Sequence, residues 1–404
     1  MTGQSRLGRV EFVAMMAMLV ATVAFSIDSM LPALPQIGAE LTPQALNRAQ
    51  LVVTSFILGL GMGTLFTGPL SDSFGRKPVV LTGAGVYISG AALAWAAPTL
   101  ELMIAARIVQ GLGAAAARIV ALAIVRDLYS GRDMARLMSF VMMVFTLVPA
   151  VSPLAGSVVI DLAGWRMIFV SFIVFALASS LWLALRLDEP LPPQARRPFR
   201  RAAMALALRE VLSHRTVRLS IAVQMLCMTT LFCSISMIQQ VFEAFFDRAD
   251  SFPVWFFMMA MIAGLFSLFN ARVVMRLGMR RMVAAALSVQ IALSGAMVLA
   301  FWLGLLPPAW QFPLYIAWQT SVFAHAALTL GNINALAMEP LGHIAGMGAS
   351  VIAAIATVGS VLLTVPVGLM FNGTPMPLFV AVLIAVAVAR GLMTRLARSE
   401  EYAV

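Results

Sequence analysis

The stretch GPLSDSFGRKPVV, residues Gly68–Val80, decides how the chain is built. Gly75 permits a left-handed or tight turn, and Pro78 suits the first turn of a helix that follows it. Asp72 can accept hydrogen bonds from Arg76 or from a neighbouring helix N-terminus. The stretch therefore predicts a short charged turn between two helices, and the apolar sequence on both sides of it predicts how long those helices are.

The composition excludes a soluble enzyme. Of 404 residues, 61% are hydrophobic and 11% charged, whereas soluble domains carry roughly 25% charged residues. One bilayer crossing needs about 20 apolar residues, and the apolar runs can be counted on that basis. Twelve predicted spans fall at 11–35, 47–70, 78–98, 101–126, 136–160, 165–187, 216–243, 252–275, 282–305, 311–336, 345–371 and 376–396.

The arginines predict the orientation of these spans. An even number of spans places both termini on one side of the membrane. If that side is cytoplasmic, 22 of the 27 basic residues lie inside. Of the other five, Arg107 and Arg118 lie within a span, and Arg48, Arg166 and Arg248 fall on the opposite face. This distribution follows the positive-inside rule. The net charge of +10 is thereby explained by topology, so no nucleic-acid partner is expected.

A hydrophilic segment divides the chain into two halves. We expect a six-helix bundle over 1–187, a cytoplasmic linker over 188–215 and a second six-helix bundle over 216–404. Within the linker, Met204–Leu212 is predicted as an amphipathic surface helix attracted to anionic membrane lipid. The alternative is a plain connector whose charge serves only to orient the chain.

An internal repeat supports this division. The turn after the second span, around Gly75, aligns with VVMRLGMRRMV at Val273–Val283, with Gly75 on Gly278 and Lys77 on Arg280. Each half thus carries a short basic turn around a glycine after its second helix. This is the pattern of a duplicated bundle.

Gly68–Val80 resembles the signature between helices two and three of the major facilitator superfamily. The resemblance implies an all-α integral membrane protein with twelve transmembrane helices in two pseudo-symmetric six-helix bundles. It also implies that Asp72, Gly75, Arg76 and Lys77, which match the signature, form a gate on the cytoplasmic side. The alternative is a basic loop that only sets topology.

The fourth span resembles the helix-four motif of the same family, matched by Arg107, Gln110 and Gly111. An arginine in an apolar helix costs at least ~2.5 kcal/mol on insertion scales, so Arg107 is expected to face the bundle interior. Arg118 lies about three turns further along the same face. We expect Arg107, Gln110 and Arg118 to contribute to proton or substrate binding. The alternative is that the arginines brace neighbouring helices.

The fifth span contains LVPAVSPLAGS, which resembles a degenerate form of the antiporter motif of drug exporters. Pro149, Pro153 and Gly156 match, while Ser152 and Ser157 replace glycines. Proline removes a helix hydrogen bond and glycine allows close approach. The resemblance implies a tightly packed gate.

Asp28 is the carboxylate placed well inside a predicted span, four residues before Pro32. This arrangement, together with Ala121–Val144, is similar to the Bcr/CflA group of multidrug exporters in bacterial inner membranes. Because a carboxyl group can hold a proton or pair with a cation, we expect Asp28 to exchange protons and substrate. The alternative is that it caps a broken helix near the outer surface.

His325 lies deep in the tenth predicted span, where it is either a proton carrier or a packing residue. The chain has 28 methionines, and soft sulfur ligands suit monovalent copper. A copper importer using His343, Met347 and methionines of spans seven and eight is therefore an alternative function. The other alternative is a purely structural role, in which these methionines fill apolar space between helices.

The function expected from the sequence is export of small amphipathic compounds in exchange for protons by a monomeric transporter. No cofactor, resident metal or ATP-binding loop is expected. Both termini are expected in the cytoplasm. A receptor or scaffold that transports nothing is the remaining alternative.

Overall fold

The computed structural model describes residues 8–401, except the side chains at 145, 146, 201, 203 and 397–401. Within that range the chain forms twelve helices of 20 residues or more. The first six are α1 Arg9–Asp28, α3 Leu51–Phe74, α4 Arg76–Trp95, α5 Leu100–Leu128, α6 Gly131–Ala163 and α7 Met167–Arg186. The others are α9 Arg215–Ala244, α10 Phe252–Leu277, α11 Met279–Trp302, α12 Pro308–Met338, α13 Ala345–Leu369 and α14 Met376–Glu401.

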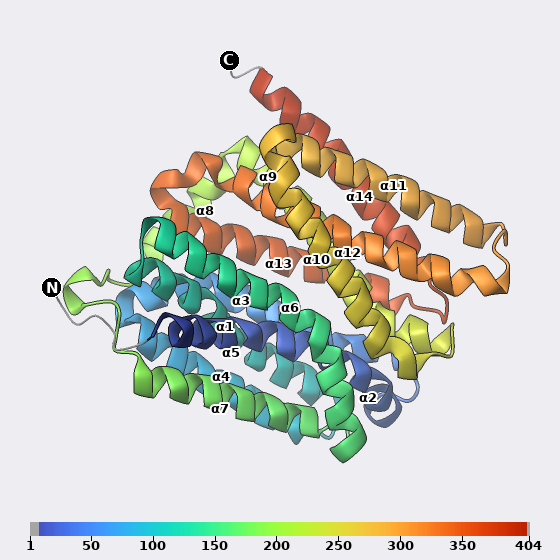
Figure 1. The fold of residues 1–404 in the computed structure, drawn as a ribbon, viewed down its shortest axis with the longest axis horizontal. Helices are drawn as coiled ribbons and strands as arrows, with labels where there is room; N and C mark the ends of the chain where they lie inside the picture. The colour runs from blue at the N-terminus through green and yellow to red at the C-terminus, as the bar shows by residue number, and fades with distance from the viewer. Residues whose placement is uncertain (1–7, 402–404) are drawn as a thin grey trace. The chain divides into compact units, whose positions relative to one another are not determined.

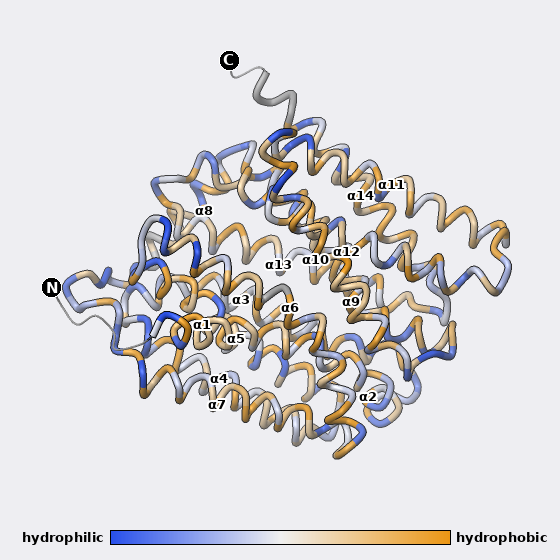
Figure 2. The backbone as a smooth tube through the Cα atoms, viewed as in Figure 1, coloured by the Kyte–Doolittle hydropathy of each residue, from blue (hydrophilic) through white to orange (hydrophobic). Residues whose placement is uncertain are grey.

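These helices confirm the predicted all-α membrane fold. Each of the twelve predicted spans corresponds to one long helix. The two spans from Pro308 to Leu369 are joined by a 3-10 turn, η5 Glu339–Ile344, so that helical structure continues between them. Figure 2 shows apolar colour along the helices and hydrophilic colour mainly at their ends and in the loops.

Two short helices lie outside this set. One is α2 Leu34–Leu41, which follows α1 and the turn η1 Leu31–Ala33. The other is α8 Arg201–Ser213, which contains the helix predicted in the linker. In α8, Ala207 and Val211 are buried against protein, whereas Leu206, Leu208 and Leu212 are exposed.

The residues group into two units by their contacts. Unit 1 comprises 1–33 and 55–203, and unit 2 comprises 34–54 and 204–404. The segment 34–54 holds α2, the turn η2 Leu46–Gln50 and the start of α3. Within unit 2 it contacts α9 and α13. For example, the side-chain amide of Asn47 donates to the carbonyl of Leu369 at 2.7 Å.

Glycines allow the helices of unit 1 to approach closely. Its helices α4, α5 and α7 run side by side (Figure 1), and α1 packs against α5, α6 and α7. A Cβ atom added to Gly113 on α5 would meet the backbone of Gly83 and Tyr87 on α4. Small residues let helices approach closely, which maximises van der Waals contact in lipid.

Unit 2 is organised around α9, which contacts α12, α13 and α14. One end of this unit is filled by aromatic rings. Phe242 on α9 lies 5.4 Å from Phe252 and 6.2 Å from Tyr315, measured between ring centroids. Trp318 and Phe379 lie 4.6 Å apart in an edge-to-face arrangement. Such pairs add about 0.5–1.5 kcal/mol to the area they bury.

The two aligned turns of the internal repeat have the same backbone geometry. Gly75 has φ 103° and ψ 157° before α4, and Gly278 has φ 79° and ψ 151° before α11. A side chain at either position would be strained, because positive φ is disfavoured for residues other than glycine. The structure therefore places the two aligned glycines in equivalent roles.

We expect Gly113→Ala to lower the free energy of unfolding by about 1–3 kcal/mol, the usual cost of overpacking. The control is Gly85→Ala on the partner helix α4, where an added Cβ would meet no described atom within 4 Å. Thermal unfolding of both variants in the same detergent measures the difference. Equal unfolding midpoints for the two variants would contradict the close approach of α4 and α5.

Candidate functional site

Asp28 lies at a break in the first span. Helix α1 ends at this residue, and the chain continues through η1 and α2 to Leu41. The side chain is 4% exposed, and its Oδ1 atom has no hydrogen-bond partner among the residues that the structure describes. Buried polar atoms are normally hydrogen-bonded. An unsatisfied carboxylate oxygen at this place is therefore available to a proton, a water molecule or a cationic ligand.

The proline–glycine segment of α6 packs against this break. A Cβ atom added to Gly156 would meet the backbone carbonyl of Ser29, the residue after Asp28. Glycine at this position brings the two backbones together. Pro153 and Pro149 lie within the same helix, about one turn and two turns before Gly156, respectively. The structure thus brings the predicted antiporter segment and the predicted exchanging acid together within unit 1.

Arg107 lies on the same side of unit 1 and is fully buried. Its Nη1 donates to Oε1 of Gln110 at 2.7 Å, and its Nη2 donates to the backbone carbonyl of Ser26 at 3.0 Å. The guanidinium carbon lies 4.4 Å from the ring centroid of Phe56 on α3. These contacts join α1, α3 and α5. They supply the bracing that the sequence left as the alternative role of this arginine.

Two residues of this polar cluster were missed from the sequence. Tyr87 on α4 is buried, and its hydroxyl lies 2.5 Å from the hydroxyl of Ser26 on α1. The Ser26 hydroxyl also donates to the Thr22 carbonyl at 2.6 Å. A tyrosine in an apolar helix is an ordinary residue, so the sequence offered no signal beyond its need for a partner. Ser26, whose hydroxyl and backbone carbonyl both make hydrogen bonds, lies two residues before Asp28.

The remaining predicted binding residues lie elsewhere. Arg118 is half-buried in α5, about three turns beyond Arg107. His325 on α12 is buried in unit 2, close to the backbone of Ala286, and among the residues that the structure describes neither ring nitrogen has a hydrogen-bond partner at normal geometry. Roles for Arg118 and His325 in binding stay predictions.

The predicted gate residues form a charged cluster around Arg76. Its Nη1 donates to Asp72 and to the Ser71 hydroxyl, each at 2.6 Å, and its Nε donates to Asp127 at 2.7 Å. The arginine is 8% exposed. Such charge-assisted bonds are about twice as strong as neutral ones. Asp127, at the end of α5, completes the cluster and was missed from the sequence.

A carboxylate from the linker holds the start of α4. Glu189 accepts hydrogen bonds from the backbone nitrogens of Arg76 at 2.8 Å, Lys77 at 2.9 Å and Leu191 at 3.0 Å. The side chain of Lys77 donates to the carbonyls of Ala184 and Leu187 at the end of α7. An acid at a helix N-terminus and a base at a helix C-terminus both complement the helix dipole. Hydrogen bonds therefore connect the turn around Gly75 to α7 and to the linker within unit 1.

The side chains proposed for copper differ in their surroundings. His343 lies in η5 and contacts the carboxylate of Glu210 on α8. Met259 is fully buried, whereas Met258 and Met261, also on α10, are exposed. Met228 accepts a weak hydrogen bond from Thr357 at 3.9 Å. None of these contacts favours a metal path over apolar packing.

Comparison with known proteins identifies relatives along most of the chain. The family model described as Major Facilitator Superfamily matches residues 14–364. An uncharacterized MFS-type transporter, YdgK of Bacillus subtilis, is 33% identical over 199 residues, which is 49% of this chain and 48% of that protein. The bicyclomycin resistance protein homolog of Haemophilus influenzae is 28% identical over 299 residues, 72% of this chain and 75% of its own. The chain thus spans about half the length of the first of these relatives and three quarters of the second.

Solved structures agree with the fold. A D-xylose-proton symporter superposes with a TM-score of 0.73 at 16% identity, covering 95% of this chain and 97% of its own. The human organic anion transporter MFSD10 gives 0.64 at 19% identity, covering 95% and 99%. At these identities the likeness concerns the fold alone.

We expect Arg107→Lys to lower the free energy of unfolding by about 1–3 kcal/mol, because lysine cannot reproduce the forked donors or the ring stacking of arginine. The matched control is Arg126→Lys on the same helix, whose Nε donates to the Leu122 carbonyl at the exposed end. Thermal unfolding measures both. A loss confined to Arg126→Lys would show that Arg107 does not brace the bundle.

We expect Glu189→Ala to lower the free energy of unfolding by about 1 kcal/mol, the usual cost of removing a helix N-terminal acceptor. The control is Asp188→Ala, which removes the neighbouring exposed carboxylate. Denaturant or thermal unfolding compares the two. If Asp188→Ala proved as damaging as Glu189→Ala, the capping role would be wrong.

Proposed function

The chain belongs to the Major Facilitator Superfamily, and from that premise we propose that it exports small amphipathic compounds across a bacterial inner membrane in exchange for protons. Relatives named for resistance to bicyclomycin, to chloramphenicol and to multiple drugs support the drug-efflux part of the proposal. The distribution of arginines supports the further proposal that both termini lie in the cytoplasm.

One observation carries the exchange. Asp28 is a buried carboxylate with an unsatisfied oxygen, at a helix break against which the proline–glycine segment of α6 packs. A charged side chain inside a membrane protein costs free energy unless it is paired. Asp28 therefore alternates between a proton and a cationic or hydrogen-bonding group of the substrate. Competition for one acid is sufficient to make transport an exchange.

The energetics are adequate for export. Moving one charge down the membrane potential releases about 2.3 kcal/mol per 100 mV, and each pH unit adds about 1.36 kcal/mol. A tenfold concentration ratio costs about 1.4 kcal/mol. For a neutral compound both contributions add, and one proton per cycle supports more than tenfold accumulation. For a monovalent cation, one-for-one exchange moves no net charge, so the pH gradient alone supports about tenfold accumulation per pH unit.

The neighbouring groups position this acid. Arg107 donates to the carbonyl of Ser26, two residues before Asp28, and Gly156 packs closely against the backbone of Ser29, the residue after Asp28. Asp28 is thereby held between two backbone anchors from α5 and α6. The cluster around Arg76 serves the cytoplasmic gate, because its ion pairs stabilise one arrangement of the loop between α3 and α4.

We expect Asp28→Asn to reduce proton-coupled flux by about tenfold or more, because the amide cannot take up and release a proton. The measurement is proton flux in vesicles containing purified protein, under an imposed pH gradient, with a panel of lipophilic cations and neutral drugs. The matched control is Asp161→Asn, the same change at an exposed carboxylate near the end of α6.

Full coupled flux in Asp28→Asn would end the exchange proposal. Loss of flux in both variants would instead show a general fault in the reconstituted protein. If the wild-type protein moved no organic compound, the result would favour the alternative that the chain is a receptor or scaffold.

A further inference from the structure

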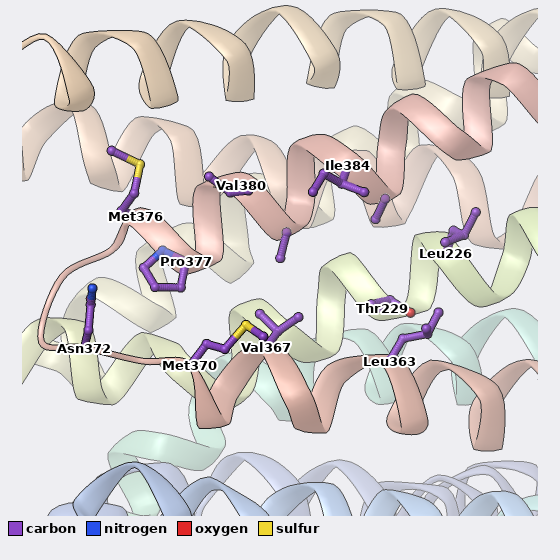
Figure 3. Close-up of a pocket in the computed structure, with 12 residues that line it drawn as sticks. Leu226, Thr229, Leu363, Val367, Met370, Asn372, Met376, Pro377, Val380 and Ile384 are labelled. Carbon is purple, nitrogen blue, oxygen red and sulfur yellow. The ribbon is translucent and has the colours of Figure 1, made fainter.

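Unit 2 contains a recess between α9, α13 and α14. Its volume is about 480 Å³, within the range of roughly 300–1,000 Å³ that small-molecule pockets occupy. Figure 3 shows the side chains of α13 and α14 facing one another across it, with Leu226 and Thr229 of α9 nearby. The recess was not evident from the sequence, because its walls come from three separate helices.

The recess opens on an exposed apolar surface of unit 2. Among its lining residues, Met370 is 68% exposed and Ile384 57% exposed, and Leu363 and Val380 are also exposed. These are apolar side chains on helices long enough to cross a membrane. The recess is therefore continuous with the surface that hydrocarbon chains cover, so its occupant must be soluble in the bilayer.

Two polar side chains line the recess: Thr229 along its depth, and Asn372 at the end beside the α13–α14 loop, which we call the mouth. Along its depth the one hydroxyl, on Thr229, donates to the Met225 carbonyl at 2.8 Å and is satisfied. At the mouth, Oδ1 of Asn372 accepts from the backbone and hydroxyl of Thr374. Its amide nitrogen points toward Met376 in Figure 3. A fitting occupant has an apolar body and a hydrogen-bond acceptor at one end.

The length of the recess matches one leaflet. Its lining on α14 runs from Met376, beside the α13–α14 loop, to Ala385. Nine residues of helix rise by about 14 Å, and the hydrocarbon core of a bilayer is about 30 Å thick. The part of α14 that lines the recess is therefore about as long as half the thickness of the hydrocarbon core, which is the depth of one leaflet.

We propose that this recess binds one acyl chain of a phospholipid from the leaflet on the side of the α13–α14 loop, with Asn372 donating to the ester region. The apolar depth, the polar mouth and the one-leaflet length fit this lipid chemistry together. The two methionines at the mouth, Met370 and Met376, have flexible side chains that adapt to chains of different shape. This site is independent of the exchange at Asp28, which lies in unit 1.

The test is photo-crosslinking in vesicles with a phosphatidylethanolamine that carries a diazirine in its acyl chain, followed by peptide mapping. In the wild type we expect labelling to concentrate on α13 and α14 along the recess. Ala381→Trp fills the recess from α14, and Val367→Trp fills it from α13. Each is expected to reduce this labelling about tenfold, as loss of contact with about two methylene groups would do.

The matched control is Val388→Trp on α14, at a 49% exposed position beyond the recess. Its labelling is expected to equal that of the wild type. Wild-type labelling in either filled variant that remains folded, shown by its unfolding midpoint, would overturn the proposal. So would labelling that a lipophilic drug displaces and excess unlabelled phospholipid does not, because that result would assign the recess to drugs.

Discussion

A charged side chain in a helix that crosses the membrane needs a partner inside the protein, because lipid supplies none. Within a bilayer an exposed backbone or charged group finds no solvent partner, and the organisation of unit 1 follows from that constraint. Arg107 is satisfied by Gln110, the Ser26 carbonyl and the Phe56 ring. The contacts that satisfy it join three helices. The contacts that compensate the charge of Arg107 therefore also hold these three helices in position around the site.

Charged residues near the helix ends make further contacts between helices. Arg186 on α7 donates to Glu11 on α1 at 2.7 Å, and Trp182 donates to the same carboxylate at 3.2 Å. At the start of α4 the backbone nitrogens of Arg76 and Lys77 meet Glu189. These contacts tie helix ends to one another. Asp28 differs from them, since its Oδ1 has no hydrogen-bond partner within the described part of the chain, and this difference makes it the site of exchange in our proposal.

The helices of the two units pack against one another in different ways. Unit 1 brings backbones together at glycines, as Gly113 does against α4 and Gly156 does against Ser29. Unit 2 fills one end with large aromatic rings and leaves a recess between α13 and α14. Close backbone packing holds an arrangement of polar groups firmly, whereas a loosely filled outer surface can accept lipid. The proposed exchange site and the proposed lipid site lie in the units whose packing suits them.

The sequence by itself determined the class of fold and the turn that identifies the family. Twelve apolar runs were sufficient because each must cross a layer of fixed thickness, and Gly75 was recognisable because positive φ requires glycine. The sequence also indicated Asp28, Arg107 and Gly156, since charge and glycine are conspicuous in apolar helices. Only the tertiary structure decided what they contact. Tyr87, Asp127 and Glu189 became visible as partners because hydrogen bonds between residues as distant as Arg76 and Glu189 depend on how helices pack, and a local pattern does not encode that packing.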